Sequence, residues 1–234
     1  MKALKIVGWV VLSLALVVNI VYWQDAWFWR RYVMLFDPTP TEGLKPFDLV
    51  QGDGRFVVPI ASLKNQTVTQ GAMDEAVEYA KEFNSYAVLA IHNGEIQLEW
   101  YADGRGPDDL TESQSMHKTL MGLFVGIAIE DGYIESVDDP VSTYIEEWRA
   151  DPRGDVTLKN LMQMSSGLGQ YPFGLNPFNS DMDWLYAGNT TEPLLNMPNA
   201  DWEQGTRYEY NNLNSELLGL IIERASGKRY ADYL

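Results

Sequence analysis

A serine and a lysine three positions apart lie at the start of a long apolar segment near the middle of the chain. This arrangement constrains the fold more than any other feature. Ser115 is followed by Lys118, and apolar residues then continue to Ile129, just before Asp131 and Gly132. The length of this run predicts a buried helix that ends near Gly132. Residues three apart on a helix share a face, so the two side chains would point into one space at the positive end of the helix dipole.

The chemistry of this pair depends on proton transfer. A serine hydroxyl becomes a good nucleophile only when a nearby group takes its proton. A lysine does this in its neutral form, and burial among apolar side chains favours that form. Ser115 and Lys118 are therefore predicted to form an acyl-transfer site. Chance is the alternative explanation, because a chain of this length should contain about one Ser-x-x-Lys at average residue usage.

A second polar element lies in the loop before another predicted helix, which covers Leu213 to Ser226 and is closed by Gly227. Tyr210 is the only one of thirteen tyrosines that has an asparagine two positions later, at Asn212. The phenol could pass a proton to a leaving group, and the amide could bind a substrate carbonyl and the lysine. The structural alternative is that Tyr210 packs under the helix and Asn212 caps it, since asparagine is favoured at that position.

These two motifs in this order resemble the serine β-lactamase and penicillin-binding-protein superfamily, in its class C branch. Further segments resemble the sequence that connects the family's motifs, and they cover residues 126–134, 137–141, 156–168 and 216–227. The resemblance extends over about residues 85 to 234 and is strongest to the 6-aminohexanoate-oligomer hydrolases of that branch. It implies an α/β (α+β) serine β-lactamase/DD-peptidase-like fold.

The resemblance also implies a role for each motif residue. Ser115 would form the acyl-enzyme, with Lys118 as its base or proton relay. Tyr210 would activate the serine, protonate the leaving group and assist deacylation, and Asn212 would position the substrate. The Ser115 backbone N–H would supply one donor of the oxyanion hole. The implied substrates are amides or esters: a β-lactam, a D-amino-acyl peptide, a short ester or an aminohexanoate oligomer.

One family motif is missing from the sequence. The third motif, Lys/His-Ser/Thr-Gly, lies on a strand well after the tyrosine loop, and no Lys-Thr-Gly, Lys-Ser-Gly or His-Thr-Gly occurs here. We therefore expect a sequence that is truncated at its C-terminus, with an incomplete sheet. The alternative function is a non-catalytic or truncated β-lactamase-like protein that binds a peptidoglycan-like ligand or a partner.

The N-terminal region predicts a membrane anchor. Ile6 to Trp23 is a run of eighteen residues without a charge, about 27 Å long as a helix and close to the thickness of a bilayer core. Lys2 and Lys5 precede this run, and aromatic residues follow it as at a membrane interface. We expect an uncleaved single-pass anchor over residues 1–29, because no Ala-x-Ala site for a signal peptidase follows. A cleaved signal peptide is the competing interpretation, and a buried core helix is a third. The resemblance then implies a domain on the periplasmic or extracellular side of the cytoplasmic membrane.

The remainder of the chain is predicted to contain a tether and one domain. Residues 30–68 are predicted to be an irregular tether, and residues 69–234 the N-terminal part of the hydrolase domain. Near the start of that domain, strand-like runs at 86–91 and 95–101 are joined through Asn93-Gly94. Asn-Gly between such runs is a strong signal for a β-hairpin.

Composition excludes several other kinds of protein. Seventeen basic and thirty-three acidic residues give a net charge of −16, which disfavours nucleic acid as a partner. The absence of cysteine excludes a disulfide scaffold and a cysteine nucleophile. His92 and His117 are the only histidines, too few for a histidine-rich metal site, and no Gly-x-Ser-x-Gly elbow is present. We expect no metal and no cofactor, and an α/β-hydrolase is disfavoured.

Overall fold

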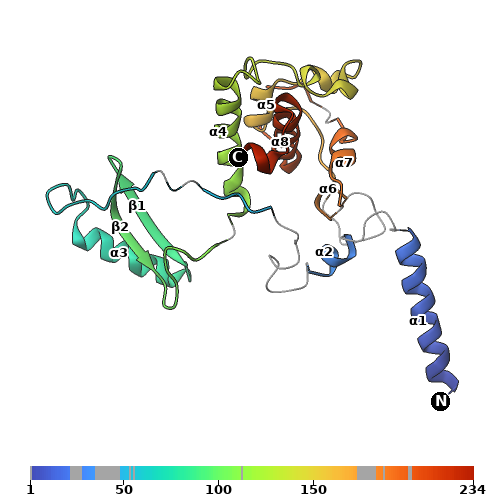
Figure 1. Ribbon diagram of the computed structural model, residues 1–234, viewed down its shortest axis with the longest axis horizontal. Helices are drawn as coiled ribbons and strands as arrows, with labels where there is room; N and C mark the ends of the chain where they lie inside the picture. Colours follow the sequence, from blue (N-terminus) through green and yellow to red (C-terminus); the bar gives the residue numbers. More distant parts are fainter. Residues whose placement is uncertain are drawn as a thin grey trace. The chain divides into compact units, whose positions relative to one another are not determined.

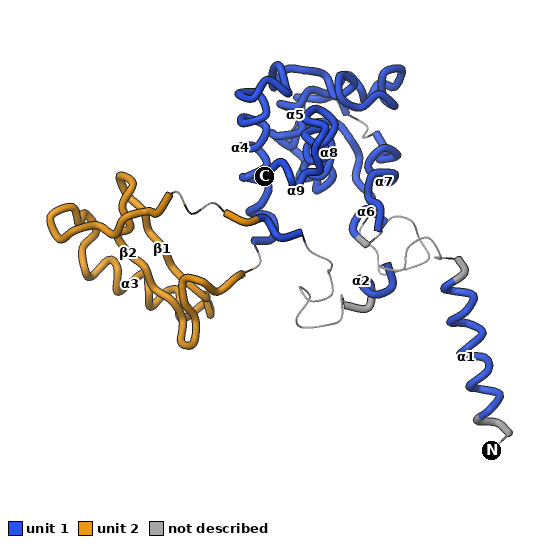
Figure 2. Tube along the Cα trace, viewed as in Figure 1, with its two compact units in different colours: residues 1–50, 113–234 blue, residues 51–112 orange. Residues whose placement is uncertain are grey.

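The computed structural model describes residues 2–21, 28–34, 48–52, 54, 56–111, 113–172, 183–186, 188–199 and 202–234. Helices and strands are labelled in Figure 1. The chain divides into two compact units, which Figure 2 shows in different colours. Unit 1 comprises residues 1–50 and 113–234, and unit 2 comprises residues 51–112. Within the described residues, the two-stranded sheet belongs to unit 2 and unit 1 is helical.

Unit 2 contains one helix and a β-hairpin. Helix α3 (Gln70–Glu82) precedes strands β1 (Ala87–His92) and β2 (Glu95–Tyr101), which pair antiparallel. At the turn between the strands, Asn93 has a φ of 52° and Gly94 a φ of 78°. A tight hairpin turn of two residues needs these positive φ angles, and asparagine followed by glycine supplies them with little strain. The predicted hairpin is confirmed, and its strands begin and end within one residue of the predicted bounds.

The N-terminal part of unit 1 contains helices α1 (Lys2–Val21) and α2 (Phe28–Met34). The predicted membrane-spanning helix is not supported, because none of the helices within the described residues is both long and apolar enough to cross a membrane.

The core of unit 1 lies between helices α4 (His117–Glu130) and α8 (Asn212–Ser226), which pack against each other. Both helices match their predictions to within one or two residues. A left-handed glycine, Gly227 at φ 70°, ends α8, and Gly132 at φ 79° lies just after α4. Glycine is favoured in such a conformation because it has no Cβ to clash with the backbone.

One hydrophobic cluster joins these two helices to the shorter elements around them. The buried residues of α4 and α8 in this cluster are Met121, Val125, Ala128, Leu213, Leu217, Leu218, Ile221 and Ile222. The shorter elements are η3 (Val141–Thr143), η4 (Glu146–Trp148), η5 (Pro152–Asp155), α5 (Leu158–Met162), α6 (Asp183–Tyr186), α7 (Thr191–Leu195) and α9 (Tyr230–Tyr233). Each large aliphatic side chain buried here stabilises the unit by roughly 1.5–3 kcal/mol. The start of α4 and the loop before α8 are thereby held on one rigid core.

Candidate active site

Ser115 lies in a single 3-10 turn, η2 (Gln114–Met116), that leads directly into α4. The backbone bends sharply just before it, because Gln114 has a φ of 45°, which is uncommon for a residue with a side chain. The Ser115 side chain is exposed, so its hydroxyl is open to a reactant. Its N–H is among the first of a helical segment, and such groups have no acceptor within the helix.

Lys118 lies one turn further on and contacts the serine. Its Nζ donates a hydrogen bond of 3.1 Å to Ser115 Oγ, as the spacing of three residues predicts. The lysine is half-buried, and its Nζ also lies 5.3 Å from the centre of the Tyr210 ring. In its neutral form, an amine at this position can accept the proton of the serine hydroxyl.

Tyr210 completes a hydrogen-bonded group of three side chains. Its phenol donates a hydrogen bond of 2.7 Å to Ser115 Oγ. Hydrogen bonding with Ser115, and then with Lys118, lowers the pKa of the Tyr210 phenol below its ordinary value of 10.0. The three polar groups therefore lie close enough for a proton to pass between them.

The loop that carries Tyr210 is fixed mainly through its backbone. The N–H of Glu209 donates to the carbonyl oxygen of Met164 at 2.8 Å, and Gly205 N–H donates to that of Ser165 at 2.7 Å. The carbonyl oxygen of Tyr210 itself accepts a hydrogen bond from Gln170 Nε2 at 3.2 Å. The segment 164–170 therefore acts as the support that places the phenol against the nucleophile.

The two asparagines after Tyr210 have different environments. Asn212 is the first residue of α8, and within the described residues its side chain makes none of the hydrogen bonds around Ser115. Its neighbour Asn211 is the helix cap, since its Oδ1 accepts from Leu213 N–H at 3.0 Å. The Nδ2 of Asn211 donates to Leu168 O, also at 3.0 Å. The capping role considered for Asn212 thus belongs to Asn211, and substrate binding by Asn212 stays a prediction.

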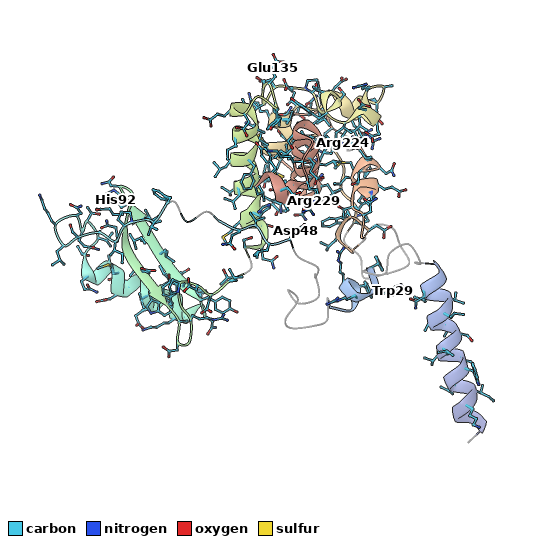
Figure 3. The ribbon with its side chains drawn as sticks, in the orientation of Figure 1. Trp29, Asp48, His92, Glu135, Arg224 and Arg229 are labelled. Carbon is cyan, nitrogen blue, oxygen red and sulfur yellow. The ribbon has the colours of Figure 1, made fainter. Side chains whose placement is uncertain are left out.

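Neither histidine joins the candidate site. His117 Nε2 lies 3.0 Å from Tyr230 OH, and His117 makes neither of the hydrogen bonds to Ser115 Oγ. His92 belongs to unit 2, where Figure 3 labels it, and its Nδ1 lies 2.9 Å from Thr67 Oγ1. Within the described ranges, no group of three or more side chains is arranged to hold a metal ion.

The structure adds one residue that the sequence analysis did not single out. Glu216 shares with Lys118 the lining of a cavity of about 250 Å³, to which α4, α7, α8 and α9 contribute. Its side chain is exposed to solvent, and partial desolvation by the protein around it raises the pKa of its carboxyl. The signal in the sequence was a carboxylate between Leu213 and Leu218, inside an otherwise buried stretch.

Comparisons with known proteins identify a family for this chain. The family model described as "Beta-lactamase" matches residues 69–234. The chain is 24% identical over 157 residues to the 6-aminohexanoate-dimer hydrolase of Paenarthrobacter ureafaciens, covering 63% of this chain and 40% of that protein. It is 24% identical over 159 residues to Protein flp of Staphylococcus aureus (strain MRSA252), and the match covers 63% of this chain and 31% of that protein. The chain thus spans less than half the length of these two curated relatives.

Solved structures show a shared fold. A proposed 6-aminohexanoate-dimer hydrolase from Bacillus anthracis matches with a TM-score of 0.62 and 21% identity, covering 89% of this chain and 58% of that one. The octameric penicillin-binding protein homologue from Pyrococcus abyssi matches with a TM-score of 0.52 and 23% identity. This match covers 71% of this chain and 41% of that one. At these identities the shared property is the fold, which combines helices with a sheet.

Proposed function

The chain belongs to the beta-lactamase family of serine hydrolases, and we propose that it cleaves an amide or ester bond through an acyl-enzyme on Ser115. One observation carries the proposal. Ser115 Oγ lies within hydrogen-bonding distance of two groups that can take its proton, Lys118 Nζ at 3.1 Å and Tyr210 OH at 2.7 Å. A serine with only a structural role would not require both an amine and a phenol that can take its proton.

The reaction proceeds in two halves. In acylation, Ser115 Oγ attacks the carbonyl carbon of the substrate while its proton passes to the Lys118–Tyr210 pair. The pair returns this proton to the departing amine or alcohol as the C–N or C–O bond breaks. In deacylation, the pair takes a proton from a water molecule whose oxygen attacks the acyl carbon. The bond between Ser115 Oγ and the acyl carbon then breaks, Oγ receives the proton from the pair, and the carboxylic acid leaves.

Two further groups support these steps. The Ser115 backbone N–H, at the start of the helical segment, donates to the carbonyl oxygen as negative charge develops on it. Asn212, two residues after Tyr210, holds the substrate carbonyl in place. Both roles come from the family resemblance, and the position of each residue at a helix start is compatible with them.

The substrate class follows from similarity rather than from fold, because one fold hosts many substrates. The relationship to a 6-aminohexanoate-dimer hydrolase favours a linear amide. A β-lactam, a D-amino-acyl peptide and a short ester are the other candidate substrates. Assays of the purified protein compare the rates at which it hydrolyses each of these compounds and a linear amide. The periplasmic or extracellular location stays a prediction, which fractionation of cells tests.

Covalent labelling tests the proposed function directly. The chain is incubated with a fluorophosphonate probe or a penicillin, and the modified peptide is identified by mass spectrometry. We expect one adduct per chain on Ser115, and none on the Ser115→Ala variant. The matched control is Ser113→Ala, a neighbouring exposed serine whose loss should leave labelling unchanged. An adduct on another residue, or no adduct on the unaltered chain, contradicts the proposal.

A further inference from the structure

Helix α8 carries a buried asparagine that the proposed mechanism does not use. Asn214 lies two residues after Asn212, and its exposed fraction is 0%. A buried amide is costly unless its polar atoms have partners. The Oδ1 of Asn214 accepts a hydrogen bond of 3.0 Å from Ser166 Oγ, and its Nδ2 donates to Met164 Sδ at 3.8 Å. Both ends of this side chain therefore hold one segment, residues 164–166.

Ser166 extends this restraint along the segment. Its side chain is buried, and its Oγ accepts the backbone N–H of Leu168 at 3.1 Å while it donates to Asn214. Between these two residues, Gly167 has a φ of 70°, and a Cβ added there would lie 2.7 Å from Trp202 O. The chain thus turns in a confined space, and the hydrogen bond from Ser166 to Asn214 fixes this turn against α8.

Met164 has a strained backbone at the other end of the same contact. Its φ of 54° is uncommon for a residue with a side chain, and such a conformation persists only where the surrounding structure imposes it. Asn214 contacts its sulfur, and the N–H of Glu209 donates to its carbonyl oxygen at 2.8 Å. Because Glu209 directly precedes Tyr210, the orientation of this carbonyl group determines where the backbone of Tyr210 begins.

We propose that Asn214 is a positioning residue for Tyr210, because its amide holds the segment 164–166 against α8 and thereby keeps the phenol at hydrogen-bonding distance from Ser115. This inference rests on the proposed function. Within the described residues, the side chain of Asn214 makes no hydrogen bond to Ser115, Lys118 or Tyr210, so it acts through the backbone of the loop. A displacement of about 1 Å in a reacting group can slow a reaction on the order of 100-fold, so a small shift of the phenol is enough to matter.

The rate of Ser115 labelling by a fluorophosphonate tests this role on the full chain. Asn214→Leu removes both contacts and keeps a side chain of similar volume, and we expect the second-order rate to fall about tenfold. Ser166→Ala breaks the same hydrogen bond and should slow labelling too. Because the two variants lose one shared contact, their effects should not add in the double variant. If circular dichroism shows that Asn214→Leu does not fold, Ser166→Ala alone carries the test.

Two further measurements separate positioning from a general loss of stability. In a Tyr210→Phe chain there is no phenol to place, so adding Asn214→Leu should change the labelling rate less than about twofold. The pKa of the Tyr210 phenol, which Ser115 and Lys118 lower by hydrogen bonding, should rise toward 10.0 in Asn214→Leu. Ultraviolet titration against Tyr210→Phe measures this pKa.

A buried aliphatic residue of the same helix provides the matched control. Ile221 has an exposed fraction of 0% and lies seven residues after Asn214, which is about two turns further along α8. Ile221→Ala removes core packing and should lower the free energy of unfolding. It should leave both the labelling rate and the pKa of the Tyr210 phenol unchanged.

The possible outcomes separate this inference from the proposed function. A normal labelling rate in Asn214→Leu, or an equal fall with and without the Tyr210 hydroxyl, would overturn the positioning role and leave the hydrolase proposal standing. An equal fall in Ile221→Ala would also overturn it, since any loss of core packing would then suffice. Absence of labelling in the unaltered chain would overturn the proposed function, and the titration of Tyr210 would still decide whether Asn214 places the phenol.

Discussion

Tyr210 OH lies 2.7 Å from Ser115 Oγ, although 95 residues separate the two in the sequence. The contact exists because α8 packs against α4 and because the loop before α8 is anchored to the segment 164–170. It places a phenol with a lowered pKa against the hydroxyl that would be the nucleophile. Together with Lys118, it gives the serine two routes for its proton.

The hydroxyl of Tyr210 should contribute more to acylation than its aromatic ring does. Tyr210→Phe removes the hydrogen bond to Ser115 and keeps the ring, so we expect the second-order rate of fluorophosphonate labelling to fall about 100-fold or more. Tyr208→Phe is the control, because Tyr208 is exposed in the same loop and should label at the normal rate. If Tyr210→Phe is labelled at a rate within threefold of the normal rate, the hydroxyl of Tyr210 is not part of the proton relay.

Loss of the Lys118 amine should slow acylation more than loss of the Tyr210 hydroxyl does. Lys118→Ala removes the amine that lies 3.1 Å from Ser115 Oγ, and acylation should fall by several orders of magnitude, as when one member of a catalytic unit is deleted. Rates of labelling over hours measure this loss. Lys159→Ala, which removes a largely exposed lysine 3.8 Å from Asp138, should have no effect. A near-normal rate for Lys118→Ala would mean that another base serves Ser115.

The titration of Tyr210 can be observed directly. Hydrogen bonds with Ser115 and Lys118 stabilise its phenolate, so the pKa of this phenol should lie below 10.0. The difference between the ultraviolet titrations of the unaltered chain and Tyr210→Phe isolates this phenol from the other tyrosines. In Lys118→Ala the pKa should rise back toward 10.0. A phenol that titrates at or above 10.0 in the unaltered chain contradicts the hydrogen-bonded arrangement.

Stability should depend on one of the two adjacent asparagines. Asn211 is buried, caps α8 and donates to Leu168 O, so Asn211→Ala should lower the free energy of unfolding by about 2–4 kcal/mol. Asn212→Ala should cost less than about 1 kcal/mol, because the side chain is half-buried and is not the cap. Urea unfolding followed by circular dichroism measures both. Equal losses would contradict the assignment of the cap to Asn211.

An ion pair on unit 1 should make stability depend on acid pH. Arg224, labelled in Figure 3, donates hydrogen bonds of 2.6 and 2.9 Å to Glu147 and lowers the pKa of that carboxyl from 4.5 to about 2. Because the folded chain binds this proton more weakly than the unfolded chain, the stabilisation is present above about pH 4.5 and disappears as the pH falls through about 2.

The size of this effect is limited by solvent. The Glu147 side chain is 47% exposed, so the pair should contribute about 1 kcal/mol or less. Glu147→Gln should lower the free energy of unfolding by that amount at pH 7, and the two proteins should converge near pH 2. Urea unfolding over a pH series measures the difference. A difference that stays constant with pH would show that ionisation of Glu147 is not its source.

Local rules predicted much of the fold. The apolar run after Ser115 predicts α4, and Asn93-Gly94 predicts the hairpin of unit 2, because each depends on neighbours in the sequence. The contact between Ser115 and Lys118 follows from helical spacing. The approach of Tyr210 was implied by the family resemblance instead, since no local rule relates residues 95 positions apart.

Other features could not be predicted because they depend on helix ends and on tertiary packing. Asn211 and Asn212 satisfy the same capping rule, and only the backbone geometry decides between them. Glu216 lines a cavity to which α4, α7, α8 and α9 contribute, and its own sequence neighbours do not reveal this position.

The support of Tyr210 has a consequence for how such a sequence can diverge. Two of the contacts that hold its loop, from Glu209 to Met164 and from Gly205 to Ser165, join backbone atoms that almost every amino acid possesses. Exposed side chains of the loop, such as Tyr208, can therefore be exchanged in descendant sequences while the phenol keeps its place. Such exchanges change the surface beside Tyr210 without a matching loss of its contact with Ser115.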